Sequence, residues 1–123
     1  METRKFNLLF VCSANVNRSK AFEREVKRLL EAWPPSIIQY NVKSSGCWYG
    51  YPDKLDQNLM DWADKILVMD LSHKIFINKN WPNHLYKIRV IGVSDQYDVD
   101  DEELKEVIEY WYQTEFLAKD GMI

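Results

Sequence analysis

The run from Phe6 to Val11, which is apolar except at Asn7, constrains the fold of this chain more than any other stretch. It lacks the polar–apolar alternation of a strand that has one face in water, and it is too short for a buried helix. Such a run is typical of a strand that helices cover on both faces, as in a parallel sheet. The rest of the chain must therefore supply helices for both sides of this strand.

Helical and strand-like patterns alternate along the rest of the sequence. Segment 20–33 places its apolar residues on one helical stripe, and Arg24, Lys27 and Arg28 fall on the other face, where water is expected to solvate them. Strands that alternate with helices predict a parallel sheet with right-handed crossovers. We therefore expect an α/β fold with three layers, a four-stranded parallel sheet flanked by helices, within one domain that spans residues 1–123. Further strands are expected at 37–42, 65–69 and 86–91, and a helix is expected at 54–63. Two more helices are expected, one that is capped by Ser72 and ends at Asn80, and a last one that begins with a capping box of Asp100 and Glu103.

The loop after the first strand combines a thiol with a guanidinium. Cys12 ends the apolar run, five residues separate it from Arg18, and Ser19 follows just before the helix. A helix N-terminus presents unpaired N–H groups and a partial positive charge, which suit a tetrahedral oxyanion. The same field favours the thiolate form of the Cys12 side chain, and an arginine can donate to two oxygens of one phosphate. The pattern predicts a phosphate-binding loop with its own nucleophile, although a lone cysteine at the end of a strand is more often a small buried hydrophobe.

Further polar and aromatic residues are expected at the same edge of the sheet. A loop rich in glycine and aromatic residues follows the second strand at 44–53, and Asp95 follows the fourth strand. Because the carboxyl ends of parallel strands meet at one edge, Cys12, this loop and Asp95 should converge. Trp48 and Tyr49 would then form an aromatic wall beside the phosphate pocket, or they would simply cover an edge of the core.

Beyond these features, the segment FVCSANVNRSKAFERE resembles the signature of the low-molecular-weight protein tyrosine phosphatases, which is an apolar strand, Cys-x5-Arg-Ser or -Thr, and a helix that carries a glutamate. Ser44-Ser45-Gly46 resembles the family's Ser-Ala-Gly after the second strand, and residues 62–70 resemble its third-strand region. Asp95-Gln96-Tyr97 resembles its Asp-Pro-aromatic acid loop. The resemblance spans residues 6 to about 110 and is greatest to the short form of the family. Lys20 and Gln96 depart from it, because the family has proline at both positions.

The resemblance implies a role for each polar residue of the site. Cys12 would attack phosphorus, and Arg18 would hold phosphate oxygens. Asp95 would protonate the leaving oxygen and then activate water, or it could be an ordinary acidic loop residue, since Asp98, Asp100 and Asp101 lie in the same stretch. Ser19 would donate its hydroxyl to the Cys12 sulfur, or it could be a plain helix N-cap. Asn15 would hold the loop through its side chain, or it could simply tolerate a turn. Tyr97 would form a second aromatic wall. The loop residues whose amides would bind phosphate, together with Arg18, are Ser13, Ala14, Asn15, Val16 and Asn17.

The function that the resemblance implies is hydrolysis of phosphotyrosine, or of aryl phosphate monoesters in general, through a phosphocysteine intermediate and without a cofactor. The expected partners are a tyrosine-phosphorylated protein and a phosphate or other oxyanion in the loop. One alternative is a binding module that kept the loop but lost turnover, which the Lys20 and Gln96 departures leave open. Another is an arsenate reductase, which shares the fold but needs additional cysteines, and residues 70–100 contain none. Asn17 occupies the position of the family's second loop cysteine, so no disulfide can shield Cys12 within the loop.

Composition narrows the setting in which such a site would act. The net charge of −3 disfavours a general nucleic-acid binder. No apolar run approaches the roughly 20 residues that span a bilayer, and the start of the chain is polar with no signal-peptide core behind it, so we expect a cytoplasmic protein with no membrane partner. Cys12 and Cys47 form no CxxC pair and are expected to be free thiols. A zinc site made of these two with His73 and His84 lacks metal-ligand spacing, so no metal site is expected.

Overall fold

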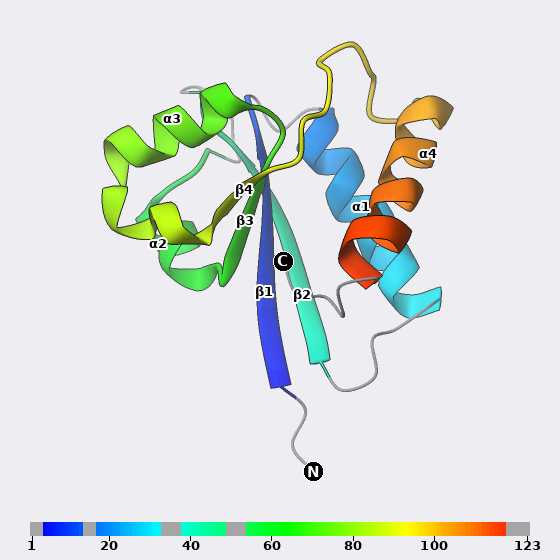
Figure 1. Ribbon diagram of the computed structural model, residues 1–123, viewed down its shortest axis with the longest axis horizontal. Helices are drawn as coiled ribbons and strands as arrows, with labels where there is room; N and C mark the ends of the chain where they lie inside the picture. Colours follow the sequence, from blue (N-terminus) through cyan, green and yellow to red (C-terminus); the bar gives the residue numbers. More distant parts are fainter. Residues whose placement is uncertain (1–3, 14–16, 33–37, 49–53, 118–123) are drawn as a thin grey trace.

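One parallel sheet forms the centre of the molecule (Figure 1). The computed structural model describes residues 4–13, 17–32, 38–48 and 54–117. The strands are β1 (Arg4–Cys12), β2 (Ile38–Gly46), β3 (Lys65–Val68) and β4 (Ile88–Val90). All neighbouring pairs are parallel, and the strand order is β2-β1-β3-β4, so β1 is paired on both sides. The predicted four-stranded parallel sheet is confirmed.

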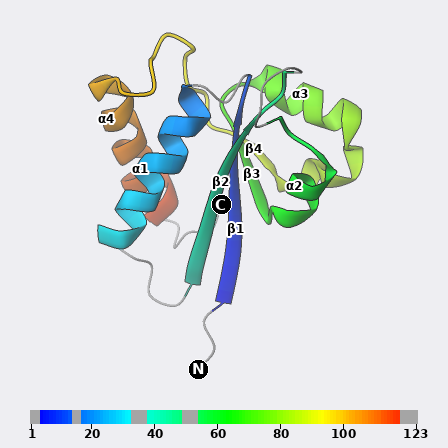
Figure 2. The ribbon, with the colours of Figure 1, turned by 180° about the vertical axis from the view of Figure 1, so that it is seen from behind.

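Helices cover both faces of this sheet, as Figures 1 and 2 show. Alternate residues of β1 enter two separate cores: Leu8 and Phe10 belong to one, and Leu9 and Val11 to the other. This two-sided burial confirms the three-layer arrangement inferred from the apolar run. None of the helices in the described ranges is long and apolar enough to cross a membrane. The helices α1 (Arg18–Ala32) and α4 (Glu102–Trp111) lie on one side, and α2 (Gln57–Trp62) and α3 (Leu71–Asn80) lie on the other.

Strand β2 is longer than predicted. Its pairing with β1 continues in register until Cys12 faces Gly46, so residues 44–46 extend the strand instead of opening a loop. The sequence did not predict this extension, because glycine is depleted in strands and clusters of serine and glycine are typical of strand ends. The pairing sets the Ser45 side chain, which is fully buried, beside the end of β1.

Strand β4 is shorter than the predicted 86–91. A 3-10 helix at Pro82–Lys87 precedes it, and the strand pairs with β3 over three residues only. Lys87 ends that helix with a buried ammonium group that donates to the carbonyl oxygen of Met60 at 2.8 Å. This bond joins the end of the 3-10 helix to α2.

Both predicted helix caps lie one or two residues from the observed ones. The cap of α3 is Asp70, whose carboxylate accepts from the backbone N–H of Ser72 at 3.0 Å, and Ser72 lies inside the helix. The cap of α4 is Asp101, which accepts from the backbone N–H of Glu103 at 2.9 Å. Asp and Ser are both good N-caps, so sequence alone could not choose between neighbours. Asp100 instead pairs with Arg24 at 3.2 Å.

The basic face of α1 lies in water, as expected. Arg24, Lys27 and Arg28 are exposed and pair with acidic side chains, Lys27 with Glu23 at 2.8 Å and Arg28 with Glu109 at 2.9 Å. Exposed pairs of this kind contribute little stability. We therefore assign these residues no binding role.

An aromatic cluster joins α1 and α4 to the sheet. The ring of Phe22 lies 5.2 Å from that of Phe10 and 5.7 Å from that of Trp111, and Phe22 is fully buried. Phe22→Ala is expected to lower the free energy of unfolding by about 3–5 kcal/mol, because it removes these contacts and leaves a cavity. Glu31→Ala, an exposed change on the same helix, should alter it by less than about 0.5 kcal/mol. Urea denaturation measures both, and equal effects would contradict the core assignment.

Candidate active site

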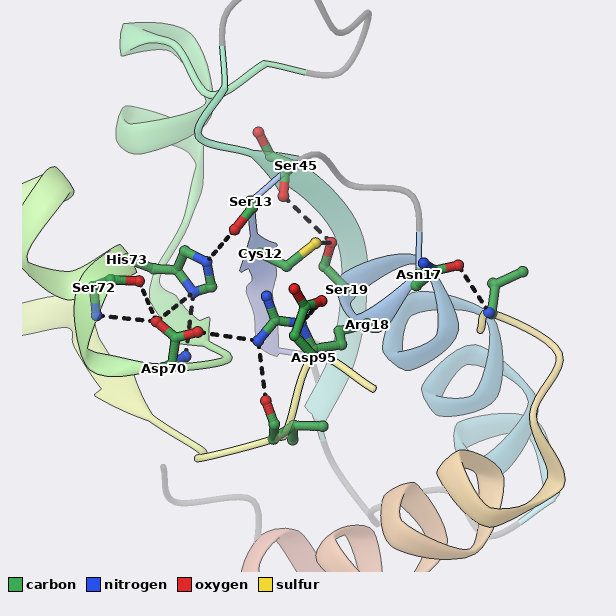
Figure 3. Close-up of polar contacts among 12 residues, drawn as sticks. Cys12, Ser13, Asn17, Arg18, Ser19, Ser45, Asp70, Ser72, His73 and Asp95 are labelled. Carbon is green, nitrogen blue, oxygen red and sulfur yellow. Dashed lines mark hydrogen bonds and ion pairs between the residues drawn. The ribbon is translucent and has the colours of Figure 1, made fainter. Parts of the chain in front are cut away.

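The predicted loop joins the carboxyl end of β1 to the amino end of α1 (Figure 3). Cys12 is the last residue of β1 and Arg18 the first of α1, so a strand and a helix hold the two ends. Both residues are only 3% exposed. The intervening Ala14, Asn15 and Val16 lie outside the described residues, so their contacts to phosphate stay predictions.

Ser19 contacts the sulfur of Cys12. The two side-chain atoms, Oγ and Sγ, lie 2.9 Å apart, and the same Oγ lies 3.3 Å from the carbonyl oxygen of Ser45. Ser19 is the second residue of α1 and is fully buried, so it is not the residue that precedes the helix, where a cap would stand. A hydroxyl carries a single hydrogen. With a Cys12 thiol the sulfur donates to Oγ and Ser19 donates to Ser45, whereas with a thiolate the hydroxyl turns to the sulfur.

Arg18 has partners from two neighbouring strand ends. Its Nη1 donates to Oδ2 of Asp70 at 3.1 Å and to the carbonyl oxygen of Val93 at 3.0 Å. Its Nε lies 3.4 Å from Oδ1 of Asp95. Because a buried charge must be paired, these contacts fix the plane of the guanidinium. Within the described residues Nη2 makes no hydrogen bond, so it can donate to a bound oxyanion.

Asp70 is a site residue that the sequence analysis did not assign. It lies two residues after the end of β3, so the rule that placed Cys12 and Asp95 at the carboxyl edge of the sheet would also have found it. Burial opposes the charged form of Asp70, but hydrogen bonds from Ser72 and Arg18 outweigh it and lower the pKa of the carboxyl. Asp70 is therefore the ionised partner of Arg18.

Asp95 is brought to Arg18 from the loop after β4, as the sequence predicted. The chain turns at Gly92, whose φ of +85° is a conformation that favours glycine, and the next carbonyl, that of Val93, accepts from Arg18. Asp95 then places its carboxylate against the guanidinium while 79% of its side chain remains exposed. An exposed carboxylate beside this guanidinium can exchange protons with water and with a molecule bound next to it.

The loop that carries Asp95 is tied to the start of α1. The side-chain oxygen of Asn17 accepts from the backbone N–H of Val99 at 3.0 Å, so this side chain holds the acid loop. Tyr97 packs against the core on the α1 side, and its hydroxyl lies 3.4 Å from Glu103. Its place as an aromatic wall beside a substrate stays a prediction.

Trp48 lies at the rim on the β2 side. Its backbone N–H donates to the carbonyl oxygen of Ser13 at 2.9 Å, and 54% of its surface is exposed. Its place as an aromatic wall beside a substrate stays a prediction. Tyr49 lies outside the described residues. The neighbouring Cys47 is a buried free thiol, and burial, with a smaller contribution from Cys12, raises its pKa to about 12. Cys47 is therefore uncharged at neutral pH.

The two histidines lie in different places. The imidazole of His73 lies 3.1 Å from the hydroxyl of Ser13, whereas His84 pairs with Asp61 at 3.3 Å. The four residues considered for zinc are thus not brought together. In the described ranges no group of three or more His, Cys, Asp or Glu residues could hold a metal ion.

Comparisons with known proteins find relatives by structure alone. No model of a protein family matches the sequence, and no curated protein matches it significantly. The YwlE arginine phosphatase from Geobacillus stearothermophilus is 21% identical with a TM-score of 0.65, over 92% of this chain and 96% of that one. A low-molecular-weight protein tyrosine phosphatase from T. tengcongensis is 23% identical with a TM-score of 0.68, over 85% and 91%. The tyrosine phosphatase Wzb from Escherichia coli K30, solved in complex with phosphate, is 22% identical with a TM-score of 0.66, over 87% and 93%.

These matches extend over most of this chain and of each solved structure. Their sequence identities are low, so they establish the architecture and not the substrate. The chain has the fold of the low-molecular-weight protein tyrosine phosphatases.

Proposed function

We propose that this protein is a cysteine-dependent phosphatase that hydrolyses phosphate monoesters, with phosphotyrosine as the substrate. The observation that supports it most is the contact of the Cys12 sulfur with the buried Ser19 hydroxyl, next to the fixed guanidinium of Arg18. A nucleophile, a hydroxyl that can stabilise it and a phosphate clamp thus occupy one strand–helix junction. The fold shared with tyrosine and arginine phosphatases agrees with this proposal.

In the first step the Cys12 thiolate attacks phosphorus and the bond to the leaving oxygen breaks. Asp95 gives its proton to that oxygen, and Arg18 and the loop amides hold the charge on the other phosphate oxygens. In the second step a water molecule attacks phosphorus, Asp95 takes a proton from it, and the phosphorus–sulfur bond breaks. The Ser19 hydroxyl donates to the departing thiolate.

Cys12 is the nucleophile in this mechanism, and Cys47 is not. Burial holds Cys47 in its thiol form, and its side chain belongs to the core on the α2 side, whereas Cys12 belongs to the core on the α1 side. An arsenate reductase would need a second reactive thiol, and a buried thiol with a raised pKa is a poor one. The structure therefore favours phosphatase chemistry over thiol-relay reduction.

Cys12→Ser is expected to reduce hydrolysis of p-nitrophenyl phosphate by at least about 10³-fold, because a serine hydroxyl is a far weaker nucleophile. It should still bind inorganic phosphate, since Arg18 remains.

Arg18→Lys should hydrolyse p-nitrophenyl phosphate about 10²-fold more slowly than the wild type, because a point charge cannot replace a two-pronged donor. Cys47→Ala is the matched control and should keep its activity. A wild-type protein that binds phosphate but hydrolyses nothing would support a binding module, and activity that requires a divalent ion would contradict the cysteine mechanism.

Asp95→Ala is expected to slow phosphotyrosine hydrolysis by roughly 10²-fold, because the tyrosyl oxygen must be protonated as it leaves. The loss on p-nitrophenyl phosphate should be smaller, since p-nitrophenolate leaves with little help. Steady-state kinetics on the two substrates measures the difference. Asp98→Ala is the control in the same loop and should show no dependence on the leaving group. If Asp98→Ala shows that dependence and Asp95→Ala does not, the acid is misassigned.

Trp48 is proposed to stack on the aromatic leaving group at the rim. Trp48→Ala should then raise KM for phosphotyrosine several-fold, about what one aromatic contact contributes, and should leave KM for an alkyl phosphate unchanged. Phosphoarginine is the substrate to compare, because an arginine phosphatase has the same fold. Faster hydrolysis of phosphoarginine than of phosphotyrosine, with no effect of Trp48→Ala, would assign the chain to the arginine-directed class.

A further inference from the structure

His73 links helix α3 to the loop that follows Cys12 (Figure 3). It is the third residue of α3 and only 3% exposed. One ring nitrogen, Nε2, lies 3.1 Å from the hydroxyl of Ser13. The other, Nδ1, lies 3.2 Å from the backbone nitrogen of Asp70, so the imidazole lies between the start of its own helix and the loop.

These two contacts fix the tautomer of His73. A backbone N–H can only donate, so Nδ1 must accept from Asp70 and carries no hydrogen. The single ring hydrogen of the neutral imidazole is then on Nε2, which donates to Oγ of Ser13. Because Oγ accepts from His73, the hydrogen of the Ser13 hydroxyl points to another acceptor.

Ser13 is held on its other side as well. Its carbonyl oxygen accepts the backbone N–H groups of Cys47 at 2.7 Å and Trp48 at 2.9 Å. The β2 end therefore fixes the Ser13 backbone, and His73 fixes its side chain. The residue directly follows the Cys12 nucleophile, so its hydroxyl hydrogen is available to an oxygen of an anion bound in the loop.

We propose that His73 is a positioning residue that, in its neutral form, holds Ser13 as a hydroxyl donor to the phosphate group. This inference rests on the proposed phosphate-binding function of the loop. It assigns to Ser13 a side-chain role beyond that of its backbone amide. His73 itself does not touch the substrate.

The surroundings of His73 keep it neutral. Asp70 faces it from the start of α3, Arg18 from α1, and Asp95 from the loop after β4. Burial lowers the pKa of His73, and Arg18 lowers it further against the opposing effect of Asp70 and Asp95. Protonation would place a second donor on Nδ1, directly against the Asp70 N–H. The imidazole must then move away from the Asp70 N–H. Acid should therefore break the bond between His73 and Ser13 and weaken phosphate binding.

Calorimetric titration of inorganic phosphate into the full chain, at pH values from about 5 to 8, tests this, because a histidine titrates in that range. His73→Gln is the conservative variant, since glutamine at this capping-box position accepts from the Asp70 N–H, donates to Ser13 and does not titrate. His73→Phe and Ser13→Ala each remove the hydrogen bond between Nε2 of residue 73 and Oγ of residue 13. His84→Gln is the matched control, because it removes the other histidine.

At neutral pH, His73→Phe and Ser13→Ala should each weaken phosphate binding roughly tenfold, the effect of losing one hydrogen bond to a charged group. The double variant should be no weaker than either single one, because both remove the same interaction. His73→Gln should keep most of the affinity. As the pH falls, the phosphate affinity of the wild type should fall relative to that of His73→Gln. The ratio of the phosphate affinities of the wild type and His84→Gln should stay constant.

The inference is overturned if Ser13→Ala binds phosphate as tightly as the wild type, or if the double variant loses the sum of the two single losses in binding free energy. It is also overturned if the ratio of the phosphate affinity of the wild type to that of His73→Gln does not change with pH. Should His73→Phe fail to fold, Ser13→Ala and the pH dependence of that ratio decide alone. Hydrolysis of p-nitrophenyl phosphate by the wild type is measured on the same samples. If the variants show the expected phosphate affinities but the wild type hydrolyses nothing, the phosphatase function is rejected and the role of His73 is kept. If the wild type hydrolyses the substrate but the variants do not show the expected affinities, the phosphatase function is kept and the role of His73 is rejected. A wild type that binds no phosphate would overturn both.

Discussion

The buried guanidinium of Arg18 is the constraint on which the rest of the site depends. Removing a charge from water costs several kcal/mol unless good partners replace the solvent. Arg18 receives them from Asp70, from the carbonyl of Val93 and from Asp95, at the ends of two neighbouring strands. Those strands are β3, which pairs with β1, and β4, which pairs with β3. The same contacts that allow the charge to be buried also fix its direction, which is what a phosphate clamp needs.

Asp70 connects this ion pair to the helix behind it. One carboxylate oxygen accepts from the first turn of α3 and the other accepts from Arg18. Its backbone N–H donates to Nδ1 of His73, and the other ring nitrogen of His73 contacts the Ser13 hydroxyl. A single strand-to-helix turn thus supports both ends of the loop, the arginine at one end and the residue after the cysteine at the other. The residues that cap α3 are therefore the same residues that hold both ends of the loop.

The sequence by itself determined the features that depend on local pattern. The apolar run of β1 required helices on both faces, and the alternation of helices and strands required parallel pairing. The spacing from Cys12 to Arg18 placed a thiol and a guanidinium at one strand–helix junction. Even Asp95 could be placed, because the carboxyl ends of parallel strands share an edge. These inferences need only periodicity, chain direction and spacing.

The tertiary structure alone decided which distant side chains meet. The register of β1 with β2 brings the carbonyl of Ser45 to Ser19, and the position of β3 beside β1 brings Asp70 to Arg18. The contacts of His73 with Ser13 and of Asn17 with Val99 join residues 60 and 82 positions apart. No local pattern encodes such pairs, because they depend on strand order and register. Those are set by how the two cores pack, and a shift of one residue would change every such partner.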